Sequence, residues 1–271
     1  MANTTKKWKG KSKEEIAEQK RRMQETMEHE QDLIWYEEET LKRFLKFAAT
    51  FCQYSYNNQL LLHAQFPNAT MVGTYGKWQK AGREIIPGER KNYIKLFAPK
   101  PSKRWVENDV IDDDGNYVLN ADGTRKKEKT LVDYMDYRAI YVYDVSQTEG
   151  DRLPELSHEG EDPLYETDED LYEALKPICN VTEHMTASDM IHCVSQQFLK
   201  KKYAIYEPHE TEACAYILSS YLQMDTHDYH TDSVFRWANG KDRKEIAACM
   251  SRVQKVSKEI IKELEDTACI A

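Results

Sequence analysis

The chain has 271 residues, a formal net charge of −9, 40% apolar residues and six cysteines. Its length and apolar content suffice for one large or two modest domains with a buried core, which excludes a chain that is disordered throughout. The cysteines form no CxxC pair and no run of 18 apolar residues occurs, so we expect a soluble cytoplasmic protein with reduced thiols and no membrane span.

Charge is distributed unevenly along the chain. Residues 77–104 contain nine Lys or Arg and two acidic residues, whereas residues 149–173 contain eleven acidic residues and one Arg. The net negative charge alone would disfavour a nucleic-acid partner, but it is largely a local property of the second stretch. We interpret that stretch as an exposed linker. The alternative is an acidic surface that mimics DNA or competes with it.

The first part of the chain predicts helices. Residues 1–13 carry five lysines and no acid and predict a basic arm, and the charged run KEEIAEQKRRMQETMEHEQ that follows predicts a solvent-exposed helix. Apolar residues then recur at helical spacing over residues 41–51, which predicts an amphipathic helix. The segment NNQLLLHAQFP predicts a third helix, which Pro67 ends.

The middle of the chain predicts β-structure, because Gly and Pro separate short segments rich in β-branched and aromatic residues. IKLFAP predicts a strand that Pro99 closes, and YRAIYVYDV predicts a second strand by its strict alternation. Between them, DG pairs at 114–115 and 122–123 flank NYVLN, which predicts a protruding hairpin over residues 105–133.

Helical patterns return from residue 168 onward. They cover residues 171–178, 187–203, 209–224 and 241–266, and the last begins with a capping-box pattern from Asp242 to Glu245. We therefore predict an α+β fold in which N-terminal helices and a small twisted β-sheet domain precede a mostly α-helical domain. The predicted parts are a lead-in (1–40), a first domain (41–155), an acidic linker (156–167) and a second domain (168–271).

Basic and aromatic residues alternate in the β region, as they do where proteins bind single-stranded nucleic acid through phosphate contacts and base stacking. The alternative is that the cations coat an ordinary sheet whose aromatic rings pack inside. The predicted contacts are Lys77, Trp78, Lys80, Arg83, Arg90, Lys91, Tyr93, Lys95, Lys103 and Arg104.

Several motifs of residues 41–155 occur together in a recognisable order. They are YSYNN (54–58), QFPNA (65–69), WQKAGR (78–83), PGE (87–89) and DVSQTEG (144–150). The segment resembles the N-terminal single-stranded-DNA-binding domain of the ArdC-type antirestriction proteins of plasmids and other mobile elements. The resemblance implies single-stranded DNA as a partner, bound with little sequence preference, and it adds Tyr54 and Gln59 as DNA contacts. Alternatively Tyr54, Asn57, Asn58 and Gln59 start a helix, and we favour a capping role for the two asparagines.

The same family continues into a zinc-metalloprotease-like domain with HExxH on one helix and a glutamate ligand on the next. Here the corresponding residues read SDMIH, so Ser188 occupies the first ligand position, Asp189 that of the catalytic glutamate and His192 the second ligand position. The third ligand would be Glu210 or Glu212. Because a serine hydroxyl is a poor substitute for imidazole, the resemblance implies a degenerate domain without catalytic residues or zinc, in which His192 bonds to one of these glutamates.

Two other functions stay open on the sequence. One is a zinc metallopeptidase with altered ligands, for which His227, His230 and Asp232 have nominal ligand spacing. The other is a protein-interaction inhibitor in which the helical domain engages a host restriction or other defence protein. No membrane partner is expected.

Overall fold

The computed structural model describes residues 11–153, 165, 167–182, 184–226, 229 and 231–268. It divides into two compact units, which are Met1–Leu96 together with Tyr141–Ala271, and Phe97–Ile140. The first ten residues of the predicted arm, most of the predicted linker, His227 and His230 lie outside the described residues.

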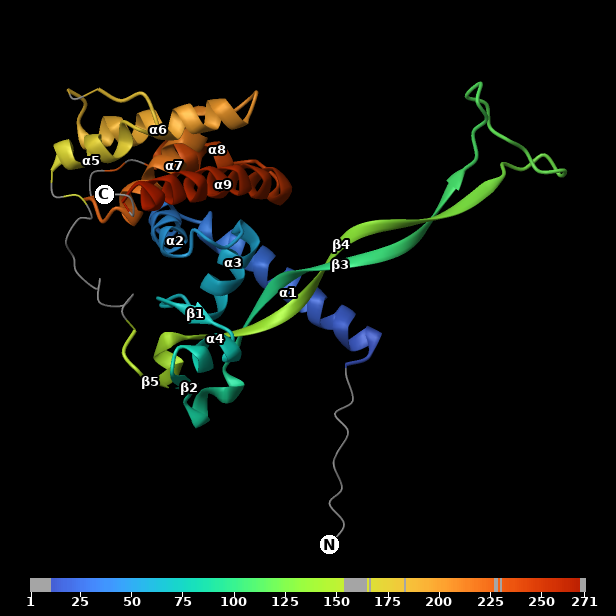
Figure 1. Cartoon of the computed structure of the whole chain (residues 1–271), viewed down its shortest axis with the longest axis horizontal. Coiled ribbons are helices and arrows are strands. Elements are labelled where there is room, and N and C mark those ends of the chain that lie inside the picture. Colours follow the sequence, from blue (N-terminus) through green and yellow to red (C-terminus); the bar gives the residue numbers. More distant parts are fainter. Residues whose placement is uncertain are drawn as a thin grey trace, which may run out of the picture. The chain divides into compact units, whose positions relative to one another are not determined.

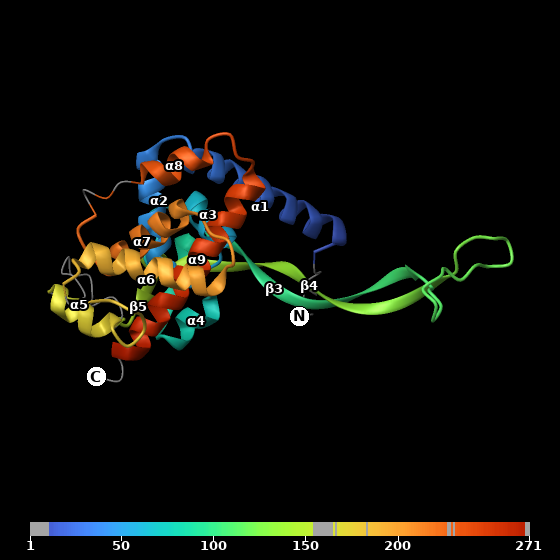
Figure 2. The same ribbon diagram turned by 90° about the horizontal axis from the view of Figure 1, so that it is seen from above.

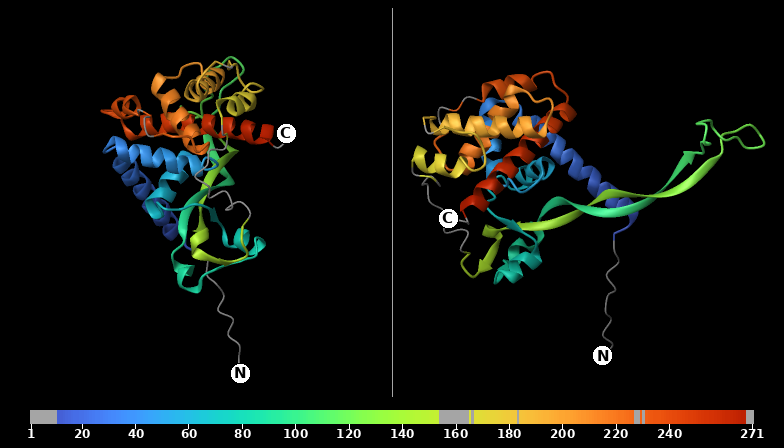
Figure 3. Two further views of the ribbon diagram at one scale, coloured as in Figure 1. Left: turned by 90° about the vertical axis from the view of Figure 1, so that its left-hand side faces the viewer. Right: turned by 45° about the horizontal axis from the view of Figure 1, so that its top comes forward.

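The N-terminal helices of the first unit are α1 (Lys13–Ile34), α2 (Glu38–Thr50) and α3 (Tyr56–Gln65). A capping box of Ser12 and Glu15 starts α1 and satisfies backbone N–H groups at its end. The helix then buries Met23, Met27 and Ile34 and packs beside α3 (Figure 3). The charged lead-in predicted to be solvent-exposed is therefore an amphipathic helix with one buried side.

The C-terminal part is helical, as predicted. Its helices are α5 (Asp168–Leu175), α6 (Ala187–Lys202), α7 (Pro208–Tyr221), α8 (Asp232–Ala238) and α9 (Arg243–Ala268). Helix α7 is buried over residues 213–219 because it packs against α2, α6, α8 and α9 (Figures 1 and 2). The contact with α2 gives helices from both predicted domains a common core. None of the described helices is long and apolar enough to cross a membrane.

The predicted start of α9 is confirmed. The backbone N–H of Glu245 donates to the carboxylate of Asp242 at 2.8 Å, and the N–H of Asp242 donates to that of Glu245 at 3.2 Å. Each carboxylate thus satisfies a helix-terminal donor that has no partner within the helix.

A smaller β-rich region completes the first unit. Its elements are β1 (Val72–Gly73), α4 (Tyr75–Lys80), β2 (Arg83–Ile85), the 3₁₀ helices η1 (Pro87–Lys91) and η2 (Val145–Gln147), and β5 (Thr148–Gly150). Strand β2 pairs antiparallel with β5, and Trp78, Ile85, Val145 and Leu153 form a local core. Helices, small antiparallel sheets and a helical C-terminal region confirm the predicted α+β class.

Two long strands, β3 (Ile94–Asp109) and β4 (Lys127–Asp144), form a twisted ribbon whose distal part is the second unit (Figure 1). The prediction that Pro99 ends the strand is wrong. The N–H of Val110 donates to the carbonyl of Lys126. In this register the backbone N–H and C=O groups of even-numbered β3 residues point toward β4, and those of odd-numbered residues, including the positions of Pro99 and Pro101, point toward the open edge of the strand. Proline is tolerated there because no ladder N–H is required. Beyond Asp109 the tip contains the predicted DG turns, with Gly115 and Gly123 at positive φ.

Candidate nucleic-acid interface and the SDMIH helix

Several residues of the sequence motifs tie the β-rich region together. The carboxylate of Asp144 accepts bonds from the backbone N–H groups of Thr70 (2.9 Å) and Met71 (3.2 Å). The amide of Gln147 donates to the carboxylate of Glu89 at 3.0 Å, which joins the DVSQTEG and PGE motifs. Buried polar groups need such partners, so these residues contribute to the fold.

Gln65 fixes the start of β3 against α3. Its side-chain carbonyl accepts a bond from the N–H of Lys95 at 3.0 Å, and its amide donates to the carbonyl of Lys95 at 3.0 Å and to that of Leu61 at 2.7 Å. The carboxamide thus replaces a neighbouring strand at the edge of β3. As a consequence, Tyr93 and Lys95 are positioned beside the N-terminal helices.

Two predicted DNA contacts lie in the interior. Gln59 is 2% exposed and donates to the carbonyl of Phe51, while Trp78 is 1% exposed and its Nε1–H donates to the carbonyl of Tyr143. Both are therefore corrected from contact residues to structural ones. Tyr54 is half-buried, and burial raises the pKa of its hydroxyl.

The proposed capping by Asn57 or Asn58 is also wrong. The residue that caps α3 is Ser55, whose hydroxyl accepts a bond from the N–H of Asn58 at 3.4 Å. Serine is among the preferred N-cap residues, and an N-cap side chain accepts a bond from the backbone N–H two or three residues further on. Ser55, three residues before Asn58, was therefore the capping signal in the sequence.

The other predicted cations are spread over several elements of the two units. Arg83 anchors β5 by donating to the hydroxyl (2.8 Å) and the carbonyl (2.9 Å) of Thr148. Lys103 and Arg104 lie in the second unit. The exposed members on α4 and η1 are Lys77, Lys80, Arg90 and Lys91.

A groove of about 350 Å³ lies between α1, α3 and the start of β3. Its lining includes three cations, Lys11, Arg22 and Lys95, together with Tyr93 and the anchoring Gln65. Of the predicted contacts, it brings together Tyr93 and Lys95. Lys11 and Arg22 were not among the predicted contacts, because more than 70 residues separate them from Lys95 in the sequence.

Two tyrosine rings stand beside each other at this groove. The ring centroids of Tyr93 and Tyr141 are 4.6 Å apart, and the residues are 39% and 36% exposed. Lys11 Nζ donates to the Tyr141 hydroxyl at 2.8 Å, which lowers the pKa of that hydroxyl, and Lys95 Nζ lies 5.8 Å from the centroid of the Tyr93 ring. Cations and aromatic faces are thus held next to each other.

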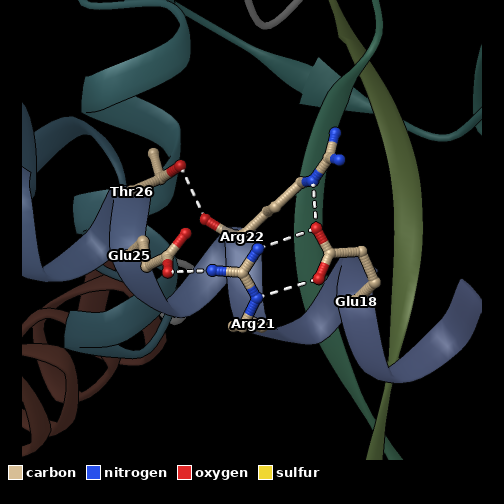
Figure 4. A network of polar contacts seen from close by, with 5 residues as sticks. All are labelled: Glu18, Arg21, Arg22, Glu25 and Thr26. Atoms are coloured by element: carbon tan, nitrogen blue, oxygen red, sulfur yellow. Dashed lines mark hydrogen bonds and ion pairs between the residues drawn. The ribbon is translucent and has the colours of Figure 1, made fainter. Parts of the chain in front are cut away.

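The two acidic residues that line the groove already have partners. Glu18 accepts bonds from Arg21 (2.8 Å) and Arg22 (2.7 Å), shown in Figure 4, and these bonds lower its pKa to about 2. Glu15 accepts the N–H of Ser12 at 2.7 Å in the helix cap. Their carboxylates therefore bond within α1 and its cap, while Lys11 and Lys95 lie beside the two rings.

The SDMIH residues begin helix α6. Asp189 accepts a bond from the Thr186 hydroxyl at 2.8 Å and its N–H donates back to that hydroxyl, so this carboxylate serves the N-terminal cap. Ser188 is exposed. His192 Nε2 lies 3.0 Å from a carboxylate oxygen of Glu212, which confirms the predicted hydrogen bond and selects Glu212 over Glu210.

Glu210 has a different role from Glu212. Its side chain is fully buried, pairs with the Arg252 guanidinium (2.7 Å from Nε) and accepts the N–H of Glu207 at 3.0 Å. A buried carboxylate needs such compensation, so Glu210 is fixed in the packing between α7 and α9.

These residues do not fit a catalytic zinc ion, which takes three protein ligands and a water. Ser188 is a neutral hydroxyl, Asp189 caps the helix and Glu210 is committed to Arg252, which leaves His192 and Glu212. Within the described parts of the chain, no three His, Cys, Asp or Glu residues are placed to hold a metal ion.

Tyr229, which follows α7 in the DTHDY segment, was not among the predicted residues. The residue is half-buried, and burial raises the pKa of its hydroxyl to about 12, with the Glu212 carboxylate acting in the same direction. The hydroxyl is therefore neutral near pH 7 and adds no charge beside the His192–Glu212 pair.

Fold and groove together define an α+β protein whose exposed site combines cations with aromatic rings. Residues 10–143 match the family model described as the N-terminal domain of the anti-restriction factor ArdC, and this part of the chain is an ArdC N-terminal domain. The match includes helix α1, which the sequence analysis placed in a separate lead-in.

A metal-free crystal structure of the antirestriction protein ArdC from plasmid R388 is similar to this chain at 16% sequence identity. The alignment covers 78% of this chain and 85% of that one, with a TM-score of 0.34. Among curated proteins, no match was found.

Proposed function

We propose that this chain is a single-stranded-DNA-binding, antirestriction-like protein of a mobile genetic element, acting in the cytoplasm through the groove of α1, α3 and β3. One observation carries the proposal: the exposed rings of Tyr93 and Tyr141 stand side by side, with Lys11 and Lys95 against them. The match of residues 10–143 to the ArdC N-terminal domain supports the same function.

The chemistry of the groove favours single strands over duplexes. A base stacked on an aromatic side chain contributes about 1–3 kcal/mol, and any base can make that contact, so binding is tolerant of sequence. In a duplex the faces of the bases are already stacked and cannot reach a tyrosine ring. Lysine and arginine beside the rings add phosphate contacts, which make the affinity dependent on salt. We predict additional phosphate contacts from four exposed cations outside the groove, Lys77, Lys80, Arg90 and Lys91.

For the C-terminal helices we propose a scaffold without peptidase activity. The roles of Asp189 and Glu210 in capping and packing support this, as does serine at position 188. A metallopeptidase with altered ligands makes the opposite prediction, namely stoichiometric zinc in the purified protein that is lost in His192→Ala. Engagement of a host defence protein by these helices stays a prediction from the family resemblance.

Fluorescence anisotropy of a labelled oligothymidine tests the DNA-binding proposal. We expect the full chain to bind the oligonucleotide at low salt, to bind a duplex of equal length more weakly, and to release both as salt rises. A mixed-sequence single strand should bind with similar affinity. No binding even at low salt, where phosphate contacts are strongest, would remove the proposal.

A further inference from the structure

The β3–β4 ribbon of the second unit exposes side chains on two faces. Side chains alternate between the faces of a strand, so odd-numbered residues of β3 share one face with odd-numbered residues of β4. Two cross-strand ion pairs mark this odd-numbered face, Lys103–Asp133 at 3.4 Å and Glu107–Lys129 at 3.3 Å. Both ion pairs join residues that lie opposite each other in the same strand register as Val110 and Lys126, so no bulge interrupts the pairing between them.

The odd-numbered face exposes large apolar side chains. Trp105 is 67% exposed, Leu131 45%, Met135 52% and Tyr137 51%. Trp105 and Leu131 lie directly between the two ion pairs, and Met135 and Tyr137 continue the face along β4. An isolated two-stranded ribbon is marginally stable in water, and apolar patches of this kind commonly mark interaction sites. A partner that covers this face would stabilise the ribbon.

The order of the charges identifies the kind of partner. At one ion pair the lysine is on β3 and the acid on β4, whereas at the other the acid is on β3 and the lysine on β4. When a second copy faces the first across a two-fold axis along the ribbon, Lys103 lies over Asp133 and Glu107 over Lys129. With the axis across the ribbon, Lys103 lies over Glu107 and Lys129 over Asp133. Either symmetric arrangement places each lysine against a carboxylate.

We propose that this face is a self-association surface, on which the ribbon of a second copy packs with Trp105 and Leu131 at its centre. The two ion pairs are neutral as a set and present carboxylates that would repel phosphates, so the face does not suit a nucleic acid. Edge-to-edge pairing of β3 is blocked where Pro99 and Pro101 lack N–H groups, and packing of the faces has no such obstacle.

The size of the face sets the expected strength. Residues 97–109 of β3 give the face a length of roughly 40 Å, and the two strands give it a width of roughly 10 Å. Each face thus has an area of roughly 400 Å², and two stacked faces bury on the order of 800 Å² in total. Stable interfaces bury about 1,200–2,000 Å². We therefore expect a weak dimer that forms at high micromolar concentration or where a common ligand brings copies together.

Sedimentation velocity of the full chain tests the proposal over concentrations from about 1 μM to about 1 mM. The sedimentation coefficient of the wild type should rise with concentration. Lys103→Glu/Lys129→Glu makes all four side chains of the two ion pairs acidic, and Glu107→Lys/Asp133→Lys makes all four basic, so each variant alone should stay monomeric. An equimolar mixture of the two should associate again. The matched control is Lys100→Glu/Lys126→Glu, which makes the same change in net charge as the acidic variant but at even-numbered positions. Its sedimentation coefficient should rise with concentration as that of the wild type does.

Trp105→Ser is a second, independent variant, because an exposed side chain can be removed without disturbing a core. It should also abolish association while leaving the circular dichroism spectrum unchanged. A wild type that stays monomeric throughout the range would overturn the proposal. So would association that survives both charge variants, or a Trp105→Ser variant that associates normally but loses affinity for single-stranded DNA.

Discussion

The three groove cations Lys11, Arg22 and Lys95 should account for a defined part of the salt dependence of DNA binding. Each can neutralise at most one phosphate, and for single strands each phosphate contact contributes about 0.7 to the slope of log K against log salt. The variant Lys11→Gln/Arg22→Gln/Lys95→Gln should therefore lower the slope by about 2. Between about 50 and 200 mM salt, the wild type should lose about 18-fold more affinity than the variant.

The assay is anisotropy of a labelled oligothymidine at four or more salt concentrations. The matched control is Lys46→Gln/Lys200→Gln/Lys244→Gln, which removes the same net charge from exposed positions on α2, α6 and α9. We expect the control to keep the wild-type slope. Tyr93→Ala should weaken binding about 5- to 150-fold at constant slope, because stacking contributes about 1–3 kcal/mol and involves no counterion.

Equal slopes for the groove variant and the wild type would refute this reasoning, even if the affinity fell. A control variant whose slope falls as much as that of the groove variant would also refute it, because the effect would then come from net charge and not from the groove.

Three further predictions concern single contacts. Glu18→Gln should raise the affinity for single-stranded DNA roughly several-fold at low salt, because it removes a negative charge beside the groove cation Arg22; unchanged affinity in the anisotropy assay would contradict the groove. Gln65→Leu should lower the free energy of unfolding in urea by about 1–3 kcal/mol, since the partly buried partners of its amide lose their bonds. Arg252→Met should lower the free energy of unfolding by about 3–5 kcal/mol because it leaves the buried carboxylate of Glu210 unpaired. Glu212→Gln, at a more exposed position, should lower it much less in the same urea titration.

Local patterns predicted most helices of this fold. The apolar spacing of α2 and α9 and the capping box of Asp242 were readable because helices are specified by residues three and four apart. The β-ribbon was only partly predictable. By local rules a proline such as Pro99 ends a strand. It is accommodated within β3 because its backbone lies on the open edge, and the sequence does not show which edge is open because that depends on the pairing register with β4.

The groove was less predictable than the fold, because its residues come together only after folding. Lys11 and Tyr141 are 130 positions apart and yet share a hydrogen bond. The basic run from 77 to 104 attracted attention by its composition, but a run of charges does not show which side chains face one surface. Trp78 looked like a stacking residue and is instead buried, since composition cannot separate core aromatic residues from exposed ones.

Photocrosslinking tests the central claim most directly. A single-stranded oligonucleotide carrying 5-iodouracil would be irradiated with the full chain, and the adducts would be mapped by mass spectrometry. We predict adducts on Tyr93 or Tyr141, suppressed by unlabelled single strand and by the Lys11→Gln/Arg22→Gln/Lys95→Gln variant. Adducts confined to other residues, with both tyrosines unmodified, would contradict the assignment of the groove as the DNA-binding site.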